Sequence, residues 1–189
     1  MDLRCFIAIE FPEELKNNID TYIEQLKATR ADVKWVLSKN LHLTLKFLGG
    51  TPEYLLVEIN KRLLSIAKLH NSFYIQIFGA GVFPNIKHPR VVWLGIQDSE
   101  EIIKLQQDID ESIAEFGFER EDRPFKPHLT IGRVRSMKNR DMMIKELATL
   151  KDVDFGKIEV RYISVMKSEL KPGGAEYFRL SEIPIGKEI

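Results

Sequence analysis

The sequence predicts an α+β fold in which mainly antiparallel sheets are covered by helices. Three observations support this prediction. Apolar residues alternate between strand-like and helix-like spacing throughout the 189 residues. The predicted strands often follow one another in pairs instead of alternating strictly with helices. A His-Leu-Thr unit occurs twice, at His42 and His128, about half the chain apart. The repeat predicts an internal duplication with two pseudosymmetric lobes.

The first quarter of the chain predicts a strand, a helix and two more strands. Residues 3–10 form a short apolar strand. A helix begins at Pro12, because a proline followed by two glutamates suits the positive end of a helix. The apolar residues of this helix share one face, namely Leu15, Ile19, Tyr22, Ile23 and Leu26. Strands follow at 33–36 and 41–49.

A turn at 49–53 is predicted to lead into a second helix. Thr51 suits the N-cap position of this helix, and Pro52 suits its first position. The remaining predicted elements are strands at 73–83 and 90–96, a helix with a capping box from Asp98 to Glu101, a strand at 128–134, a short helix within 139–150, and two strands near 155–170 and 175–183. Together, residues 1–189 are expected to form a single domain of two interleaved lobes.

The composition limits the classes of function. Twenty-eight basic residues balance 28 acidic ones, so nucleic acid would have to be bound by a local patch. Cys5 is the single cysteine, which excludes an internal disulfide and a cysteine-built zinc site. The N-terminal apolar run is too short for a signal peptide, and no segment has the roughly 20 apolar residues of a membrane span. We expect a cytoplasmic monomer.

The repeated unit places polar side chains on a strand that is otherwise apolar. Side chains alternate across a strand, so His42, Thr44 and Lys46 are predicted to share one face, opposite the leucines. The same rule groups His128 with Thr130. If the two strands lie side by side, two imidazoles and two hydroxyls converge on one cleft.

Two opposed histidines suit acid–base chemistry. The usual histidine pKa is about 6.5, so one ring can be neutral while the other is protonated near neutral pH. A threonine hydroxyl close to each ring suits a phosphoryl oxygen, and the set as a whole suits phosphodiester cleavage. A metal site is the rival use of two histidines. It would need further ligands at recognisable spacing, and the sequence contains neither HxxxH nor HExxH. No metal or cofactor is expected.

The two units, HLTL at 42–45 and HLTI at 128–131, resemble the paired HxTx motifs of the two-histidine (2H) phosphoesterase superfamily. More narrowly, the chain resembles the RNA 2′,3′-cyclic phosphodiesterases, also called 2′-5′ RNA ligases. The resemblance extends over RCFIAIEFP, VKWVLSKNLHLTLKFLG, GVFPN, PRVVWLGI and FKPHLTIGRV. It implies a bilobal fold with two antiparallel sheets flanking a central cleft and helices on the outside.

The resemblance also implies a role for each motif residue. His42 corresponds to the proton donor for the departing ribose 3′ oxygen, and His128 to the proton acceptor that activates water. Thr44 and Thr130 correspond to the residues that hold the phosphate. The implied substrate is RNA with a 2′,3′-cyclic phosphate end, the implied product is a 2′-phosphomonoester, and the implied mechanism uses no metal or nucleotide cofactor. The family name adds 2′-5′ ligation as a further implied activity.

Several other residues are candidate substrate contacts, namely Lys46, Arg133, Arg4, Trp35, Phe83 and Arg90. Trp35 or Phe83 could stack a terminal base. Strict alternation places Arg133 on the Leu129 side of its strand, so contact with phosphate requires an irregularity there. For each of these residues, core packing or a surface ion pair is an equally good interpretation.

Two alternative functions fit the same residues. One is a non-catalytic module that binds RNA 3′ ends and grips the phosphate without turnover. The other is a phosphoesterase that acts on small cyclic nucleotides.

Overall fold

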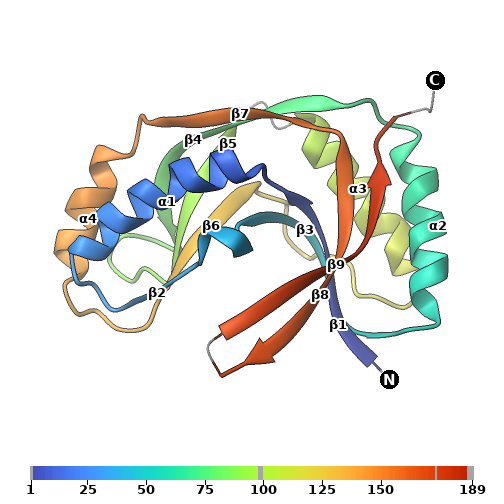
Figure 1. Ribbon diagram of the computed structural model, residues 1–189, viewed down its shortest axis with the longest axis horizontal. Coiled ribbons are helices and arrows are strands. Elements are labelled where there is room, and N and C mark those ends of the chain that lie inside the picture. The colour runs from blue at the N-terminus through green and yellow to red at the C-terminus, as the bar shows by residue number, and fades with distance from the viewer. Residues whose placement is uncertain (1, 98–99, 173, 187–189) are drawn as a thin grey trace.

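The computed structural model describes residues 2–97, 100–172 and 174–186. Within these residues the chain forms two antiparallel sheets and four α-helices, which Figure 1 shows as two halves placed side by side. The predicted α+β class is confirmed.

The first sheet, here called sheet A, has the strand order β3-β1-β8-β9. Its strands span Asp2–Glu10 (β1), His42–Pro52 (β3), Tyr162–Lys171 (β8) and Gly174–Pro184 (β9). β8 and β9 form a long hairpin that projects from the sheet toward the other half (Figure 1). β3, which carries His42, is therefore an edge strand of sheet A.

The second sheet, sheet B, has the strand order β2-β6-β5-β4-β7. Its strands span Val33–Trp35 (β2), Phe73–Phe83 (β4), Val91–Gln97 (β5), His128–Val134 (β6) and Asp154–Val160 (β7). β6, which carries His128, lies between β2 and β5. Cα atoms of β3 and β6 approach within 8 Å of each other, so the two strands that carry the repeated unit are neighbours.

Two of the described helices pack on the half that does not contain the strand before them. α1 (Glu13–Ala28) follows a strand of sheet A but packs on sheet B, where Asn18 donates a hydrogen bond of 2.7 Å to the Phe155 carbonyl of β7. α3 (Glu100–Ala114) follows a strand of sheet B but packs against β3 of sheet A, beside α2 (Leu55–Ala67). α4 (Arg140–Thr149) packs against β4. This exchange of helices supports the expected single domain of two interleaved lobes, which remains a prediction.

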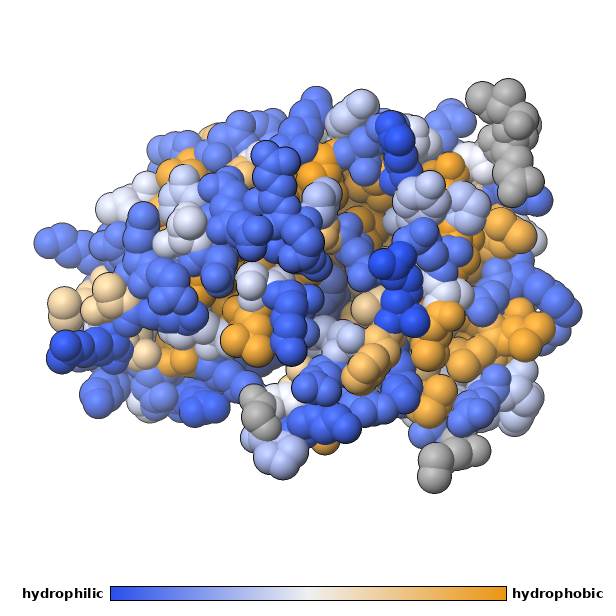
Figure 2. Space-filling model, in the orientation of Figure 1, coloured by the Kyte–Doolittle hydropathy of each residue, from blue (hydrophilic) through white to orange (hydrophobic). Residues whose placement is uncertain are grey.

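In the described residues, the larger of two core clusters lies between the sheets and their helices. It includes fully buried side chains from both halves, such as Ile7, Ile23, Ile59, Ile75 and Leu94. Burying each such side chain contributes about 1.5–3 kcal/mol to the free energy of folding. Cys5 belongs to this cluster and is 1% exposed. Charged and polar residues cover most of the face seen in Figure 2.

Two predicted elements differ from the structure. Thr51 and Pro52 do not begin a helix, because β3 continues through Pro52 by pairing with Asp2 and Leu3 at the start of β1, and α2 begins at Leu55. The strand predicted near 155–170 is two strands, because the chain leaves sheet B at Val160 and enters sheet A at Tyr162. The predicted capping box begins at Asp98, which lies outside the described residues.

Candidate active site

The two histidines are held in the same way. His42 begins β3, and its Nδ1 lies 2.7 Å from the carbonyl oxygen of Asn40, two residues earlier. His128 begins β6, and its Nδ1 lies 2.7 Å from the carbonyl oxygen of Lys126, also two residues earlier. Both rings are half-buried. The similarity of the two units therefore includes a hydrogen bond whose acceptor, a backbone carbonyl, lies outside the repeated His-Leu-Thr unit.

This shared arrangement fixes which nitrogen can react. A carbonyl oxygen only accepts hydrogen bonds, so Nδ1 carries the proton in both rings. Nε2 is then the reactive nitrogen of each histidine. A neutral ring offers an acceptor at Nε2 and a protonated ring offers a donor, so the same geometry suits a base or an acid.

Aromatic rings and a carboxylate surround His42. The ring centroids of Phe6 and Tyr177 lie 4.8 Å and 5.0 Å from its centroid. Glu10 is its direct partner across β1 and β3. Burial lowers the pKa of His42, whereas the hydrogen bond to the Asn40 carbonyl and the negative charge of Glu10 act to raise it.

Glu10 itself is held by two neighbours from the β8–β9 hairpin. It accepts a hydrogen bond of 2.7 Å from the Ser164 hydroxyl, and Nε of Arg179 lies 2.9 Å from its carboxylate.

His128 contacts a different aromatic ring. The Phe83 ring meets it edge-on with ring centroids 5.1 Å apart, and the same Phe83 ring packs at a tilt against Trp93, also at 5.1 Å.

Both motif strands contain a bulge at the same position. In β3, Thr44 pairs with Ala8 and Lys46 pairs with Ile7, which leaves Leu45 without a partner. In β6, Thr130 pairs with Trp93 and Gly132 pairs with Val92, which leaves Ile131 without a partner. An extra residue of this kind reverses the faces of the residues that follow it. The face of each sheet that carries its histidine and threonine is called the histidine face below.

The bulge in β3 removes Lys46 from the histidine face, so the prediction that it lies beside His42 and Thr44 is wrong. Lys46 is 1% exposed on the opposite face. Its ammonium group forms an ion pair with Asp110 of α3 and donates a hydrogen bond to the Glu119 carbonyl. The Asp110 carboxylate also accepts a hydrogen bond of 3.2 Å from the Glu121 amide. Lys46 thus ties β3 to the segment that precedes His128.

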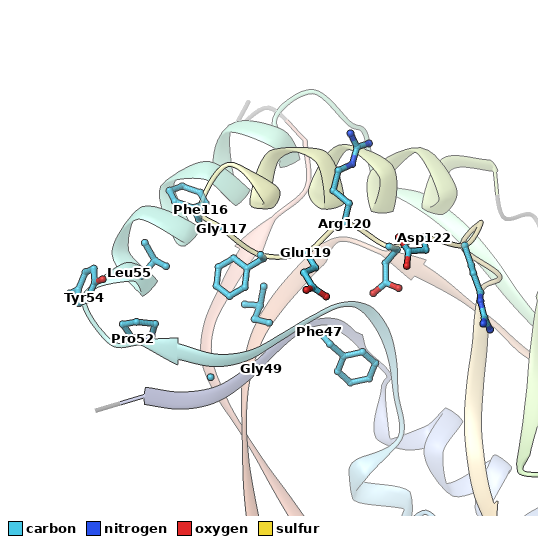
Figure 3. A pocket seen from close by; sticks show the side chains of 15 residues that line it. Phe47, Gly49, Pro52, Tyr54, Leu55, Phe116, Gly117, Glu119, Arg120 and Asp122 are labelled. Carbon is cyan, nitrogen blue, oxygen red and sulfur yellow. The ribbon is translucent and has the colours of Figure 1, made fainter.

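The next residue in each strand returns to the histidine face. Phe47 pairs with Phe6 and is 64% exposed. Figure 3 shows Phe47 on the opposite side of β3 from Phe116, Glu119 and Asp122. Arg133 pairs with Val91, is exposed, and shares a face with Thr130. The bulge therefore supplies the irregularity that phosphate contact by Arg133 requires.

The other candidate contacts lie in different parts of the structure. Phe83 touches His128, so it supports a motif residue. Trp35 packs on the opposite face of β6, where a Cβ atom at Gly132 would lie 2.9 Å from its ring, so the proposed stacking on a base is not supported. Arg4 is exposed on β1 at the far end from His42, opposite Gly50. Arg90 is exposed just before β5, where its carbonyl accepts the Val134 amide.

Sequence reasoning missed four residues near His42. Phe6 and Glu10 could have been found, because alternation along the first strand places both on one face. Tyr177 and Arg179 carried no such signal, since only the pairing of β8 with β1 brings the hairpin to this face.

A pocket of about 890 Å³ lies beside the site between the second half of β3 and residues 116–123 (Figure 3). Phe47, Gly50 and Pro52 of the lining lie on the histidine face, since their partners Phe6, Arg4 and Asp2 share the face of Glu10, and neither histidine lines the pocket. Its lining holds three acidic residues, Glu119, Glu121 and Asp122, and two basic ones, Arg120 and Arg123, so its formal net charge is only −1.

The chain is similar to proteins of a known family. The family model of the 2′-5′ RNA ligase superfamily matches residues 11–170. The chain belongs to this superfamily.

Individual relatives cover nearly the whole chain. An "RNA 2′,3′-cyclic phosphodiesterase" from Methanothermobacter thermautotrophicus is 38% identical over 177 residues, which cover 94% of this chain and 96% of the relative. One of the same name from Thermotoga maritima is 35% identical over 182 residues, which cover 95% of this chain and 94% of the relative.

None of the described helices combines the length and apolar content needed to cross a membrane.

Solved structures share the fold. A crystal structure of a protein from Thermus thermophilus matches with a TM-score of 0.80 and 29% identity, covering 98% of this chain and 100% of that one. The structure of E. coli LigT complexed with 3′-AMP matches with a TM-score of 0.74 and 25% identity, covering 99% and 100%.

Proposed function

We propose that this superfamily member is an RNA 2′,3′-cyclic phosphodiesterase that converts 2′,3′-cyclic ends to 2′-phosphomonoesters. The observation that carries the proposal is the matched pair of histidines. Each begins a motif strand, bonds through Nδ1 to the carbonyl two residues earlier, and is followed two positions later by a threonine on the same face. The names of the relatives supply the class of substrate.

The proposed reaction uses each histidine once. His128 takes a proton from water through Nε2, and the water oxygen attacks phosphorus. The bond between phosphorus and the ribose 3′ oxygen breaks, and His42 gives its Nε2 proton to that oxygen. The phosphate stays on the 2′ oxygen. Each proton transfer is typically worth about 10²- to 10⁴-fold in rate.

Thr44 and Thr130 are assigned to the non-bridging phosphate oxygens. Each hydroxyl shares a strand face with one histidine, so the two can donate to the same phosphate from opposite sides. Arg133 lies beyond Thr130 on the same face and adds a positive charge where negative charge builds up on the phosphate.

The environment of His42 constrains its role as the acid. Burial lowers its pKa, which favours the neutral ring in the free protein. Glu10 opposes this shift, and the negative charge of a bound phosphodiester acts in the same direction as Glu10. We infer that substrate binding promotes the protonated form of His42.

The test is hydrolysis of an oligoribonucleotide with a 2′,3′-cyclic phosphate end, in the presence of EDTA and followed by ³¹P NMR. We expect conversion to the 2′-phosphomonoester. Binding without turnover would instead support the module that binds RNA 3′ ends. Turnover of cyclic mononucleotides in preference to the oligonucleotide would support the small-nucleotide alternative, and activity lost in EDTA would support a metal.

The same protein can be tested for ligation. If the 5′-hydroxyl of a second RNA replaces water as the attacking group, the product is a 2′-5′ linkage. Adding an excess of a 5′-hydroxyl oligonucleotide should then yield a longer product in which the new junction, unlike the other linkages, resists nucleases specific for 3′-5′ linkages.

A further inference from the structure

Two cations face each other across the edge of sheet B. Lys34 of β2 is the direct partner of Arg133 of β6. Like charges placed directly opposite in adjacent strands destabilise the pair. Among the residues that the structure describes, neither side chain forms an ion pair with an acid. A bound anion that contacts both side chains would offset the repulsion between them.

Lys34 lies on the histidine face of sheet B. Its neighbours Val33 and Trp35 pack on the other face, where a Cβ atom at Gly132 would lie 2.7 Å from Val33 and 2.9 Å from Trp35. Lys34 is exposed and pairs with Arg133, which shares the face of Thr130. Thr130, Arg133 and Lys34 thus form a line from the phosphate site toward the edge of the sheet.

The β8–β9 hairpin borders the end of this line. A Cβ atom placed on Gly174, the first residue of β9, would lie 3.8 Å from Nζ of Lys34. The next residue, Ala175, accepts a hydrogen bond of 2.9 Å from Asn40, whose own carbonyl holds His42. The Lys34 ammonium group therefore lies between β2 and the hairpin, near the segment that positions His42.

We propose that Lys34 binds the phosphate backbone upstream of the reacting RNA end and makes the protein prefer oligoribonucleotides to cyclic mononucleotides. This inference rests on the proposed function. The line of residues from Thr130 through Arg133 to Lys34 gives the upstream chain a positively charged exit across β6 and β2. In the other lobe Phe47 takes the place of Arg133, and β3 is itself the edge strand, so the line of cations has no counterpart there and the RNA is expected to leave across sheet B.

The test compares Lys34→Ala with wild type on two substrates, a cyclic-ended oligoribonucleotide and a cyclic mononucleotide. Because the lost contact is an ion pair between an exposed, solvent-screened lysine and a phosphate, kcat/KM for the oligonucleotide should fall roughly two- to fivefold. The value for the mononucleotide should not change. The slope of log(kcat/KM) against log[salt] for the oligonucleotide should become shallower by about 0.7.

Two variants serve as controls. Lys34→Arg should restore the oligonucleotide preference, because it keeps the charge. Lys104→Ala removes an exposed lysine from α3, on the outer side of sheet A, and should behave as wild type on both substrates.

Equal losses on both substrates, or no loss on either, would overturn the assignment of Lys34. Binding of a 2′-phosphate-ended oligonucleotide, measured by fluorescence anisotropy, separates this inference from the proposed function. If wild type hydrolyses neither substrate, the proposed function fails. Weaker oligonucleotide binding by Lys34→Ala would still support a phosphate contact at Lys34, and unchanged binding would contradict it.

Discussion

The two motif strands are alike up to their bulges and differ immediately after them. His42 and Thr44 in β3 correspond to His128 and Thr130 in β6, with the same hydrogen bond at each Nδ1 and an unpaired residue after each threonine. The two residues that follow share no chemistry. On the buried side, Lys46 corresponds to Gly132, and on the histidine face, Phe47 corresponds to Arg133.

This contrast separates the shared chemistry from the individual contacts of each lobe. The equivalent residues are those that the proposed reaction uses in pairs. The non-equivalent residues give each lobe its own contacts, since Lys46 holds α3 and the segment before His128, whereas Gly132 leaves room for Val33 and Trp35. Phe47 and Arg133 make the histidine faces of the two lobes different, so we expect a substrate to bind in one orientation.

The largest expected effect is the loss of either histidine. His42→Ala and His128→Ala should each lower kcat roughly 10²- to 10⁴-fold, because each removes one proton transfer. Circular dichroism and a thermal melt check that each variant folds. Near wild-type activity in one variant would contradict the claim that both histidines take part in the reaction.

Lys46 should contribute an ion pair to the stability of its lobe, whereas its counterpart Gly132 has no side chain that could form one. Lys46→Met leaves the Asp110 carboxylate with only the more distant Arg120, at 3.9 Å, as ionic partner, so the loss of unfolding free energy should approach, as an upper limit, the roughly 3–5 kcal/mol of a fully broken buried pair. Urea denaturation measures the change. The double variant Lys46→Met/Asp110→Leu removes both charges and should recover much of the loss. A single variant as stable as wild type would contradict the role assigned to Lys46.

The two threonines should give smaller, matched effects. Thr44→Val and Thr130→Val keep the side-chain shape and remove one hydroxyl donor, which is worth about 1.5–3 kcal/mol when its partner is a charged phosphate oxygen. We expect kcat/KM to fall roughly ten- to 100-fold in each variant. An effect confined to one threonine would show that only one lobe holds the phosphate.

The smallest expected effect is a shift in the pH profile. The charge of Glu10 raises the pKa of His42, so Glu10→Gln should lower that pKa further. An acid must be protonated, so activity that depends on His42 as acid is lost as the pH rises through its pKa. The alkaline limb of kcat/KM should therefore move to lower pH. If the acidic limb moves instead, His42 is the base and His128 the acid.

The sequence predicted the fold class and the paired motifs well, because apolar periodicity and an exact repeat are local signals. It could not predict the bulges at Leu45 and Ile131, which depend on pairing with neighbouring strands. Strict alternation therefore placed Lys46 on the wrong face and Arg133 on the buried side. Tyr177 escaped prediction for a similar reason, because the hairpin meets His42 only in three dimensions.

Single-turnover hydrolysis by His42→Ala, His128→Ala and the double variant tests most directly whether the two histidines form one site. Residues that act as a unit have strongly non-additive effects. If one reaction needs both rings, the double variant should be no slower than the slower single variant. A double variant whose rate loss equals the product of the two single losses would contradict a shared site.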